Sequence, residues 1–280
     1  MTRDHRTGRD GPRNGGAIVA RGKLLALFSL LAVVATLTGC ASGGPLFSGY
    51  GGPPLRVGVS PDYPPVVFER DGTIVGIEAD LALRAGEALK RPIEFVRIPF
   101  PDLLDALEAG EIDVVMSGLS ITPERAERVR FTAPYMEVGQ LAMIRRQDVA
   151  RFGRPNTIRR AGARVGYERA TTGERYVAEG LPFAESFAFD SVEAGLRSLR
   201  AERIDFFVHD APTIWRIAGG LDHRDLIGLY RPLTQEQLAW AVRPEDEQLR
   251  AVLDATLSHW QREGMIEPIV QRWIPVRVIR

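Results

Sequence analysis

Short apolar runs alternate with helical stripes along the chain from Leu55 onward. In the first half, strands are expected over Leu55–Val59, Ile93–Val96 and Ile112–Met116. Between the first two strands, four apolar residues recur at four-residue spacing, namely Ile77, Leu81, Ala85 and Leu89. This spacing puts them on one face of a helix. A second short helix is predicted over Asp102–Glu108. The alternation of strands and helices predicts a largely parallel sheet covered by helices.

The same pattern restarts after an apolar strand over Leu141–Ile144. Further strands are expected over Arg164–Tyr167, Ser186–Phe189, Ile204–Val208 and Leu226–Leu229. Helices are expected over Gly173–Glu179, along the stripe Val192, Leu196 and Leu199, and over Ala211–Ile217. A second α/β unit follows from this pattern, and ligands of paired α/β units tend to bind in the crevice between them, near strand C-termini.

The last part of the chain returns to a strand followed by helices. The strand is predicted over Leu238–Val242, and an amphipathic helix then runs from Leu249 to Trp260. Gly264 is predicted to end that helix, and a final helix covers 266–273. Residues 275–280 are expected to form an unpaired tail.

The N-terminus has the pattern of a bacterial lipoprotein signal peptide over residues 1–39. Basic residues end at Arg21 and Lys23, an apolar run covers 24–37, and Leu-Thr-Gly precedes Cys40. Cys40 is the only cysteine, so it is predicted to be lipidated at a cleaved N-terminus rather than to form an intrachain disulfide. Residues 40–54 are rich in Gly, Ser and Pro and are predicted to form a flexible tether. An anchored extracytoplasmic monomer, in the periplasm or at the cell surface, is therefore expected.

Charge changes the picture once the signal peptide is removed. Residues 1–39 carry six Arg or Lys and two Asp, so 36 − 6 = 30 basic and 36 − 2 = 34 acidic residues remain, a formal net of −4. A mildly acidic chain offers no electrostatic footprint for nucleic acid. A content of 45% hydrophobic and 26% charged residues fits a soluble globular body.

The segment from Val115 to Tyr135 holds the first candidate chemistry. A strand runs into Ser117, Gly118, Ser120 and Thr122, and Pro123 follows where a helix could begin. Thr122 has the position of an N-cap, so free backbone N–H groups, hydroxyls and the Arg125 guanidinium would surround a bound carboxylate. The alternative for these residues is a capped turn leading into a solvated helix.

Other polar and aromatic residues follow strands in both units. Tyr63 lies in a proline-rich loop after the first strand, and Phe100 follows the second. Thr171 and Thr172 open a helix, and Asp210 follows an apolar strand. Each has a structural alternative: local packing for the aromatics and N-capping for the others. Together they supply donors for a carboxylate and an acceptor for an ammonium group.

Catalytic and metal chemistry have little support in the sequence. The four histidines show no metal-ligand spacing, and the chain has no nucleophile elbow and no P-loop. No cofactor and no metal site are therefore expected.

The chain resembles the extracytoplasmic solute-binding proteins of polar amino-acid ABC transporters, family 3. The segments that carry the resemblance occur in order from about Leu55 to Trp273: LRVGVSPDYPPVVF, GIEADLA, LLDALEAGEIDVV, SGLSITPER, RFTAPY, VGYERATTGE and VHDAPT. The resemblance implies a two-lobed periplasmic-binding-protein fold of type II, with a mainly parallel sheet flanked by helices in each lobe. Lobe 1 would comprise 55–138 plus 238–274 and lobe 2 would comprise 139–237, joined by two hinge strands.

The resemblance also implies roles for site residues. Arg125 would hold the ligand α-carboxylate, helped by the backbone from Gly118 to Ser120 and by Thr122. Thr171 and Thr172 would add donors from lobe 2, and Asp210 would pair with the α-ammonium group. The ligand side chain would lie between Tyr63 and Phe100. Positions that tune specificity would be Ser60, Ser117, Glu168 and His209. Partners would be an amino acid and an ABC permease in the membrane.

Two departures from the family pattern bear on the ligand. Ser60 stands where binders of basic and polar amino acids commonly have Asp, although Asp62 is near, and Glu168 adds negative charge. Ala170 replaces a usual Gly in the lobe 2 cradle. The expected ligand is a polar or basic L-amino acid, and no catalysis is expected. The alternatives are a periplasmic cyclohexadienyl or arogenate dehydratase, with Glu168 or His209 as the acid, and a sensor or adaptor domain, which the absence of a later span or catalytic domain disfavours.

Overall fold

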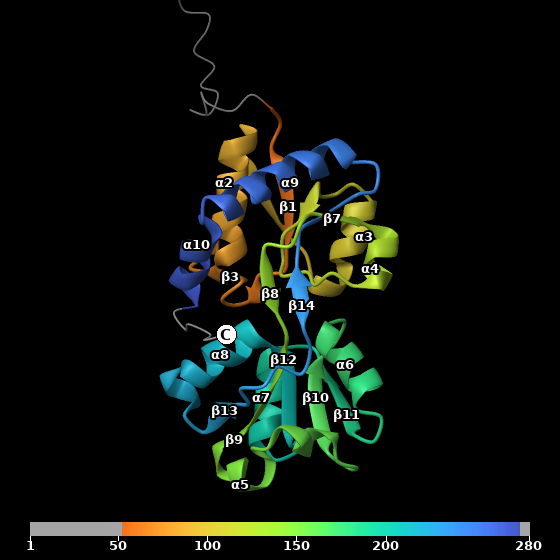
Figure 1. Ribbon diagram of the computed structural model, residues 1–280, viewed down its shortest axis with the longest axis vertical. Coiled ribbons are helices and arrows are strands. Elements are labelled where there is room, and N and C mark those ends of the chain that lie inside the picture. Colours follow the sequence, from red (N-terminus) through yellow and green to blue (C-terminus); the bar gives the residue numbers. More distant parts are fainter. Residues whose placement is uncertain (1–51, 275–280) are drawn as a thin grey trace, which may run out of the picture. The chain divides into compact units, whose positions relative to one another are not determined.

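The first of two five-stranded sheets has the strand order β5-β1-β6-β15-β7. The structure, a computed structural model, describes residues 52–274 (Figure 1). The predicted signal peptide, Cys40, residues 40–51 of the tether and the tail 275–280 lie outside the described residues. The strands are β1 Leu55–Val59, β5 Ile93–Arg97, β6 Val114–Val115, β7 Arg130–Phe131 and β15 Ala241–Val242. Both β5 and β6 pair with β1 in parallel, and β15 runs antiparallel to β6 and to β7, so four of the five strands share one direction.

Helices bury apolar residues against both faces of this sheet. They are α2 Ile77–Leu89, α3 Leu103–Glu108, α9 Glu247–Arg262 and α10 Ile266–Trp273, while the short helix α4 Pro123–Arg128 has no buried residue. One core joins α2, α9 and α10 to the sheet, and a second core lies under α3 (Figure 1). The predicted stripe of α2 is in this core, with Ile77, Leu81 and Ala85 fully buried. Burying each Leu or Ile side chain contributes about 1.5–3 kcal/mol.

The second sheet repeats this plan, with strand order β11-β10-β12-β9-β13. Its strands are β9 Gln140–Arg145, β10 Arg164–Glu168, β11 Glu185–Phe189, β12 Phe206–Asp210 and β13 Leu226–Gly228. Only β9 runs against the other four. Its helices are α5 Val149–Phe152, α6 Thr172–Gly180, α7 Val192–Arg200 and α8 Ala211–Gly219, and the sheet has an apolar core on each face. The prediction of two α/β units with mainly parallel sheets is confirmed.

Two short strands carry the chain between the sheets. They are β8 Met136–Val138 and β14 Glu236–Leu238, which pair antiparallel and lie side by side in Figure 1. The predicted single strand over Leu238–Val242 is therefore wrong: its first residue ends β14, and β15 begins only at Ala241. At Gly139 any side chain would collide with the carbonyl oxygen of Thr234, so the close approach of the two crossing segments requires glycine there.

Smaller elements complete the fold. A three-stranded sheet of β2 Asp62–Tyr63, β3 Val67–Arg70 and β4 Thr73–Val75 was not predicted, and its first strand lies in the predicted proline-rich loop. Short 3-10 turns occur at η1 Phe100–Asp102, η2 Arg146–Asp148, η3 Pro155–Arg159 and η4 Leu221–His223. None of the helices within 52–274 has the length and apolarity that crossing a membrane requires.

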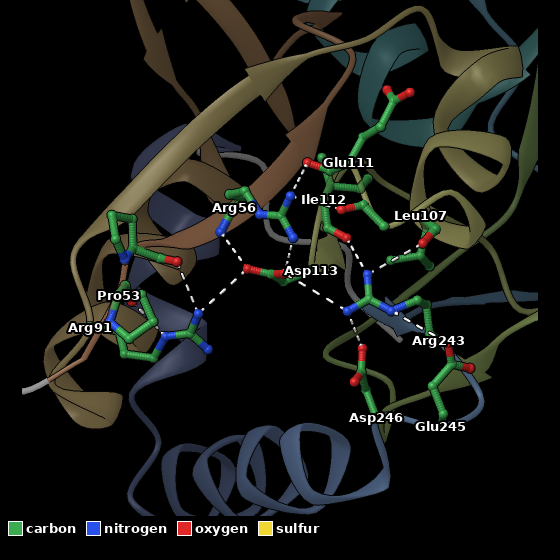
Figure 2. A network of polar contacts seen from close by, with 12 residues as sticks. Pro53, Arg56, Arg91, Leu107, Glu111, Ile112, Asp113, Arg243, Glu245 and Asp246 are labelled. Atoms are coloured by element: carbon green, nitrogen blue, oxygen red, sulfur yellow. Dashed lines mark hydrogen bonds and ion pairs between the residues drawn. The ribbon is translucent and has the colours of Figure 1, made fainter.

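Of the strand predicted over Ile112–Met116, only β6 Val114–Val115 is observed, and Asp113 before it is the centre of a polar network (Figure 2). The Asp113 carboxylate accepts the backbone N–H of Arg56 at 3.0 Å and a guanidinium N–H of the same residue at 2.6 Å. Arg91 and Arg243 also pair with it, at 3.4 and 3.8 Å. Although burial opposes ionisation, Arg56 and Arg91 hold the pKa of Asp113 below its ordinary value. This network fixes the backbone at the start of β1 and before β6.

Candidate functional site

A cavity of about 280 Å³ lies between residues that precede β8 and residues that follow it. From the first group it is lined by Asp62, Tyr63, Pro99, Phe100, Pro101, Gly118, Ser120 and Arg125. From the second group it is lined by Glu168, Arg169, Thr171, Thr172, Phe189, Asp190, His209 and Asp210. Most of these residues follow the C-terminal ends of strands, which is where α/β sheets present ligand sites.

Arg125 reaches the cavity from the first turn of α4. Thr122 caps this helix, because its hydroxyl accepts the Arg125 N–H at 3.3 Å, which confirms the predicted N-cap. The guanidinium donates to the carbonyl oxygens of Ser120 at 2.9 Å and Ala170 at 3.3 Å. It lies over the Phe100 ring, 5.6 Å from its centroid. Burial lowers the pKa of Arg125, and Asp210 and Glu236 oppose that effect. Two of the five N–H groups are used in these bonds, so a bidentate grip on a carboxylate is still possible.

Asp210 is the last residue of β12, two residues beyond the predicted end of that strand. It precedes α8, but its carboxylate makes no capping bond. One oxygen instead accepts the Tyr63 hydroxyl, and the other accepts the side-chain amide of Gln140. Burial raises the pKa of Asp210 above its ordinary value, while the Tyr63 and Gln140 hydrogen bonds lower it. The acid is thus held in place at the wall of the cavity.

Thr171 and Thr172 stand at the start of α6, as predicted. The Thr171 hydroxyl caps the helix by accepting the Glu174 N–H at 3.4 Å, and it donates to the Glu168 carbonyl at 2.7 Å. The Thr172 hydroxyl donates to Glu236 at 2.6 Å. Ala170 adopts φ +59°, the left-handed conformation in which Gly is favoured. The helix N-terminus therefore opens beside Arg125, as a carboxylate site requires.

Acidic residues line another part of the cavity. The Asp62 carboxylate accepts the Ser60 hydroxyl at 2.9 Å, so the serine holds this acid in place. Glu168 lies 2.9 Å from His209 Nε2. The Asp210 N–H donates to His209 Nδ1 at 2.8 Å, so Nε2 carries the proton shared with Glu168. Burial lowers the pKa of His209, but the carboxylates of Glu168 and Asp210 outweigh burial and raise it.

Two predicted site residues do not line the cavity. The Ser117 hydroxyl is fully buried and accepts the Ser60 N–H at 2.8 Å, so it supports the loop that carries Asp62. The Thr122 side chain is used as the helix cap. Gly118 does line the cavity, but its N–H donates to Glu78 and is not free for a ligand. A side chain at Gly118, where φ is +67°, would collide with the Tyr63 ring.

Three buried polar residues behind the cavity were missed from the sequence: Glu78, Gln140 and Glu236. The Glu78 carboxylate accepts the Gly118 N–H at 2.5 Å, and Gln140 and Glu236 contact Asp210 and Thr172. For Glu236 the sequence does hold a signal. It lies on the same side of β14 as the buried Leu238, while Gln237 between them is exposed. A charged residue at a buried position of an alternating strand needs a partner.

Glu78 should make stability fall with rising pH. Burial raises its pKa to about 8 from an ordinary 4.5, although Tyr135, the Gly118 N–H and Trp240 lower it. The folded protein then binds a proton that the unfolded chain releases, so stability is complete below about pH 4.5 and falls as pH rises to about 8. The loss is up to roughly 5 kcal/mol. Urea denaturation between pH 4.5 and 9 should show this fall in the wild type and not in Glu78→Gln.

The matched control for this measurement is Glu87→Gln, an exposed position on the same helix. Its pH profile should follow that of the wild type. Equal pH profiles for the wild type and Glu78→Gln would contradict the assignment.

Comparison with known proteins agrees with this geometry. The sequence profile of the bacterial extracellular solute-binding proteins, family 3, matches residues 55–276. The ABC transporter arginine-binding protein 1 of Escherichia coli K12 is 29% identical over 232 residues, which cover 79% of this chain and 90% of the relative. The cyclohexadienyl dehydratase of Pseudomonas aeruginosa is 24% identical, and the match covers 80% of this chain and 83% of the relative.

A solved structure of an ancestral amino acid-binding protein, a precursor of cyclohexadienyl dehydratase, is also similar. It has a TM-score of 0.72 and 28% identity, and the match covers 78% of this chain and 94% of that one. The fold is therefore the type II periplasmic-binding-protein fold that the sequence predicted, and the chain belongs to the bacterial extracellular solute-binding proteins, family 3.

Proposed function

We propose that the protein is a lipid-anchored extracytoplasmic receptor that binds a basic amino acid and delivers it to an ABC permease by cleft closure. Arg125 takes the α-carboxylate and Asp210 takes the α-ammonium group, with Tyr63 and Phe100 against the side chain. Because these residues come from both sides of the crossing strands, the ligand stabilises the closed form through contacts that exist only when the cleft is shut. Membership of an extracytoplasmic family of amino-acid-binding proteins supports this function.

The charge balance of the cavity carries the proposal of a basic ligand. Arg125 and Asp210 are matched by the two charges of any amino acid. Arg169 and Asp190 pair with each other at 2.8 Å. Asp62 and Glu168 remain, and even with His209 protonated one negative charge is left unmatched among the described residues that line the cavity. A ligand side chain with a positive charge neutralises it, whereas a neutral side chain leaves it without a partner of opposite charge.

Calorimetry with arginine and citrulline tests this charge argument directly. Citrulline has the shape of arginine without the charge, so it is the matched control ligand. We expect arginine, lysine or ornithine to bind at least roughly tenfold more tightly than citrulline or glutamine, a difference of about 1.4 kcal/mol. Glu168→Gln and Asp62→Asn should each reduce the ratio of arginine to citrulline affinity. Equal affinity of the wild type for arginine and citrulline would rule out a basic ligand.

The same charges disfavour the dehydratase alternative. Prephenate has two carboxylates, and the second guanidinium among the described cavity residues, that of Arg169, is exposed and has its charge balanced by Asp190. A second carboxylate would face the acidic residues and be repelled. We expect no turnover of prephenate or arogenate by the purified protein; measurable release of carbon dioxide would overturn the proposal that the protein is not an enzyme.

The anchor is tested separately through Cys40. The lipoprotein pattern before this residue supports attachment by acyl chains. Cys40→Ser should move the protein from the membrane fraction to the soluble extracytoplasmic fraction without changing its ligand affinity. Retention of the serine variant in the membrane would contradict lipid anchoring.

A further inference from the structure

A buried carboxylate at the start of β14 connects the two sides of the cavity. Glu236 Oε2 accepts the Ser120 hydroxyl at 2.8 Å and the Thr172 hydroxyl at 2.6 Å. Its other oxygen accepts the Thr234 hydroxyl at 2.6 Å. Ser120 belongs to the segment before α4, and Thr172 is the first residue of α6. One acid on a crossing strand therefore bonds to a residue on each side of the cleft.

Glu236 itself is not among the residues that line the cavity, whereas Ser120 and Thr172 are. Thr172 also accepts the side-chain amide of Gln140 at 3.0 Å, and the same amide bonds to Asp210. Gln140 follows the other crossing strand, and its backbone N–H donates to Thr234 at 2.8 Å. Hydrogen bonds thus connect both crossing segments to Thr172, which is proposed to lie at the ligand carboxylate, and to Asp210, which is proposed to bind the ligand ammonium group.

The negative charge of the Glu236 carboxylate strengthens the hydrogen bonds that it accepts. Three hydroxyl groups donate to one carboxylate, and hydrogen bonds to an ionised acceptor are about twice as strong as neutral ones. The field of Glu236 also reaches Arg125 and favours the charged guanidinium. Side chains that are already held in the bound arrangement lose less freedom when a ligand arrives.

We propose that Glu236 is a positioning residue that fixes Ser120 and Thr172 in register across the cleft and so prepares the site for its ligand. The inference rests on the proposed function for its effect on affinity, but the effect on the two hydroxyl-bearing segments does not depend on which ligand binds.

Ligand affinities of Glu236 variants test whether this residue prepares the site for its ligand. Glu236→Gln keeps the shape and loses the charge, and it should weaken arginine binding several-fold. Glu236→Leu removes all three acceptor bonds and should weaken binding by roughly tenfold or more. In a Thr172→Val background the glutamine substitution should have a smaller effect, because the two residues act through one bond. The matched control is Gln237→Ala, the exposed neighbour on β14, which should bind as the wild type does.

Amide hydrogen exchange of the ligand-free protein tests whether Glu236 holds the segments that carry Ser120 and Thr172. Exchange measured by mass spectrometry should rise in the peptides 117–125 and 170–176 of the glutamine variant, on both sides of the cleft at once, and not in the control. If the leucine variant does not fold, the glutamine variant alone decides. Unchanged exchange in both segments would overturn the positioning role. If the wild type binds no amino acid while exchange rises as expected, the proposed function fails and the positioning role stands.

Discussion

Arg125→Ala is expected to lose most amino-acid binding while the fold survives. Among the described residues of the cavity, its guanidinium is the more buried one and has three N–H groups left for a carboxylate, whereas Arg169 is exposed and already bonded to Asp190. Removing one partner of a buried charge pair costs about 2–5 kcal/mol, which is roughly a 30-fold to several thousand-fold rise in Kd. The helix cap is retained because Thr122 accepts the backbone N–H of residue 125, not its side chain.

Isothermal titration of the variant with arginine measures this loss. Arg125→Lys should recover only part of the affinity, because an ammonium group cannot make the bidentate contact. The control is Arg128→Ala on the same helix, which removes exposed ion pairs to Asp105 and Glu108 and should leave Kd unchanged. An affinity of Arg125→Ala close to that of the wild type would refute the role of this residue.

Asp210→Ala should reduce affinity by a similar factor, because it removes the partner of the opposite charge of the ligand. Its carboxylate is buried at the end of β12 and is held by Tyr63 and Gln140. Asp210→Asn is the conservative companion, because it keeps the size and one acceptor oxygen while it removes the charge and the second acceptor. Both variants should still fold, with an unfolding temperature below that of the wild type in the absence of ligand, because Tyr63 and Gln140 lose an acceptor.

The pH dependence of ligand affinity shows whether Asp210 acts through its charge or through its shape. The ligand ammonium pairs with the ionised form of Asp210, and burial raises the pKa of that acid. Lowering the pH through this raised pKa therefore protonates Asp210 and weakens binding in the wild type. Asn at position 210 cannot bind this proton, so the weak affinity of the asparagine variant should not fall further as the pH is lowered through that range. Wild-type affinity in Asp210→Asn would show that the charge is not used.

The residues found from the sequence are those whose signals are local. Arg125 and Thr122 stand three residues apart in one capped turn, and Thr171 caps the start of another helix. Strand ends and helix starts can be located from periodicity, so the amino-acid pattern suffices to place these side chains near a crevice. The family resemblance added the expected roles of Arg125 for the ligand carboxylate and of Asp210 for the ligand ammonium group.

The residues missed have partners far away in the sequence. Glu78 bonds to Gly118, 40 residues later, and Glu236 bonds to Ser120, 116 residues earlier. Ser117 was expected at the ligand, but neighbouring residues of an extended segment face opposite sides, and its hydroxyl turns into the core while Gly118 meets the cavity. Tertiary contacts alone decide which of these polar groups faces the ligand and which supports it.

The pairing of β8 with β14 has a consequence for how such proteins can be rebuilt. The chain leaves for the second sheet along β8 and returns along β14, its hydrogen-bonded neighbour, with Val138 opposite Glu236. The segment between β8 and β14 is therefore continuous in sequence, and its two ends lie side by side. An exchange of this segment between relatives would therefore need only two adjoining splice points, and it would replace every cavity residue that follows β8.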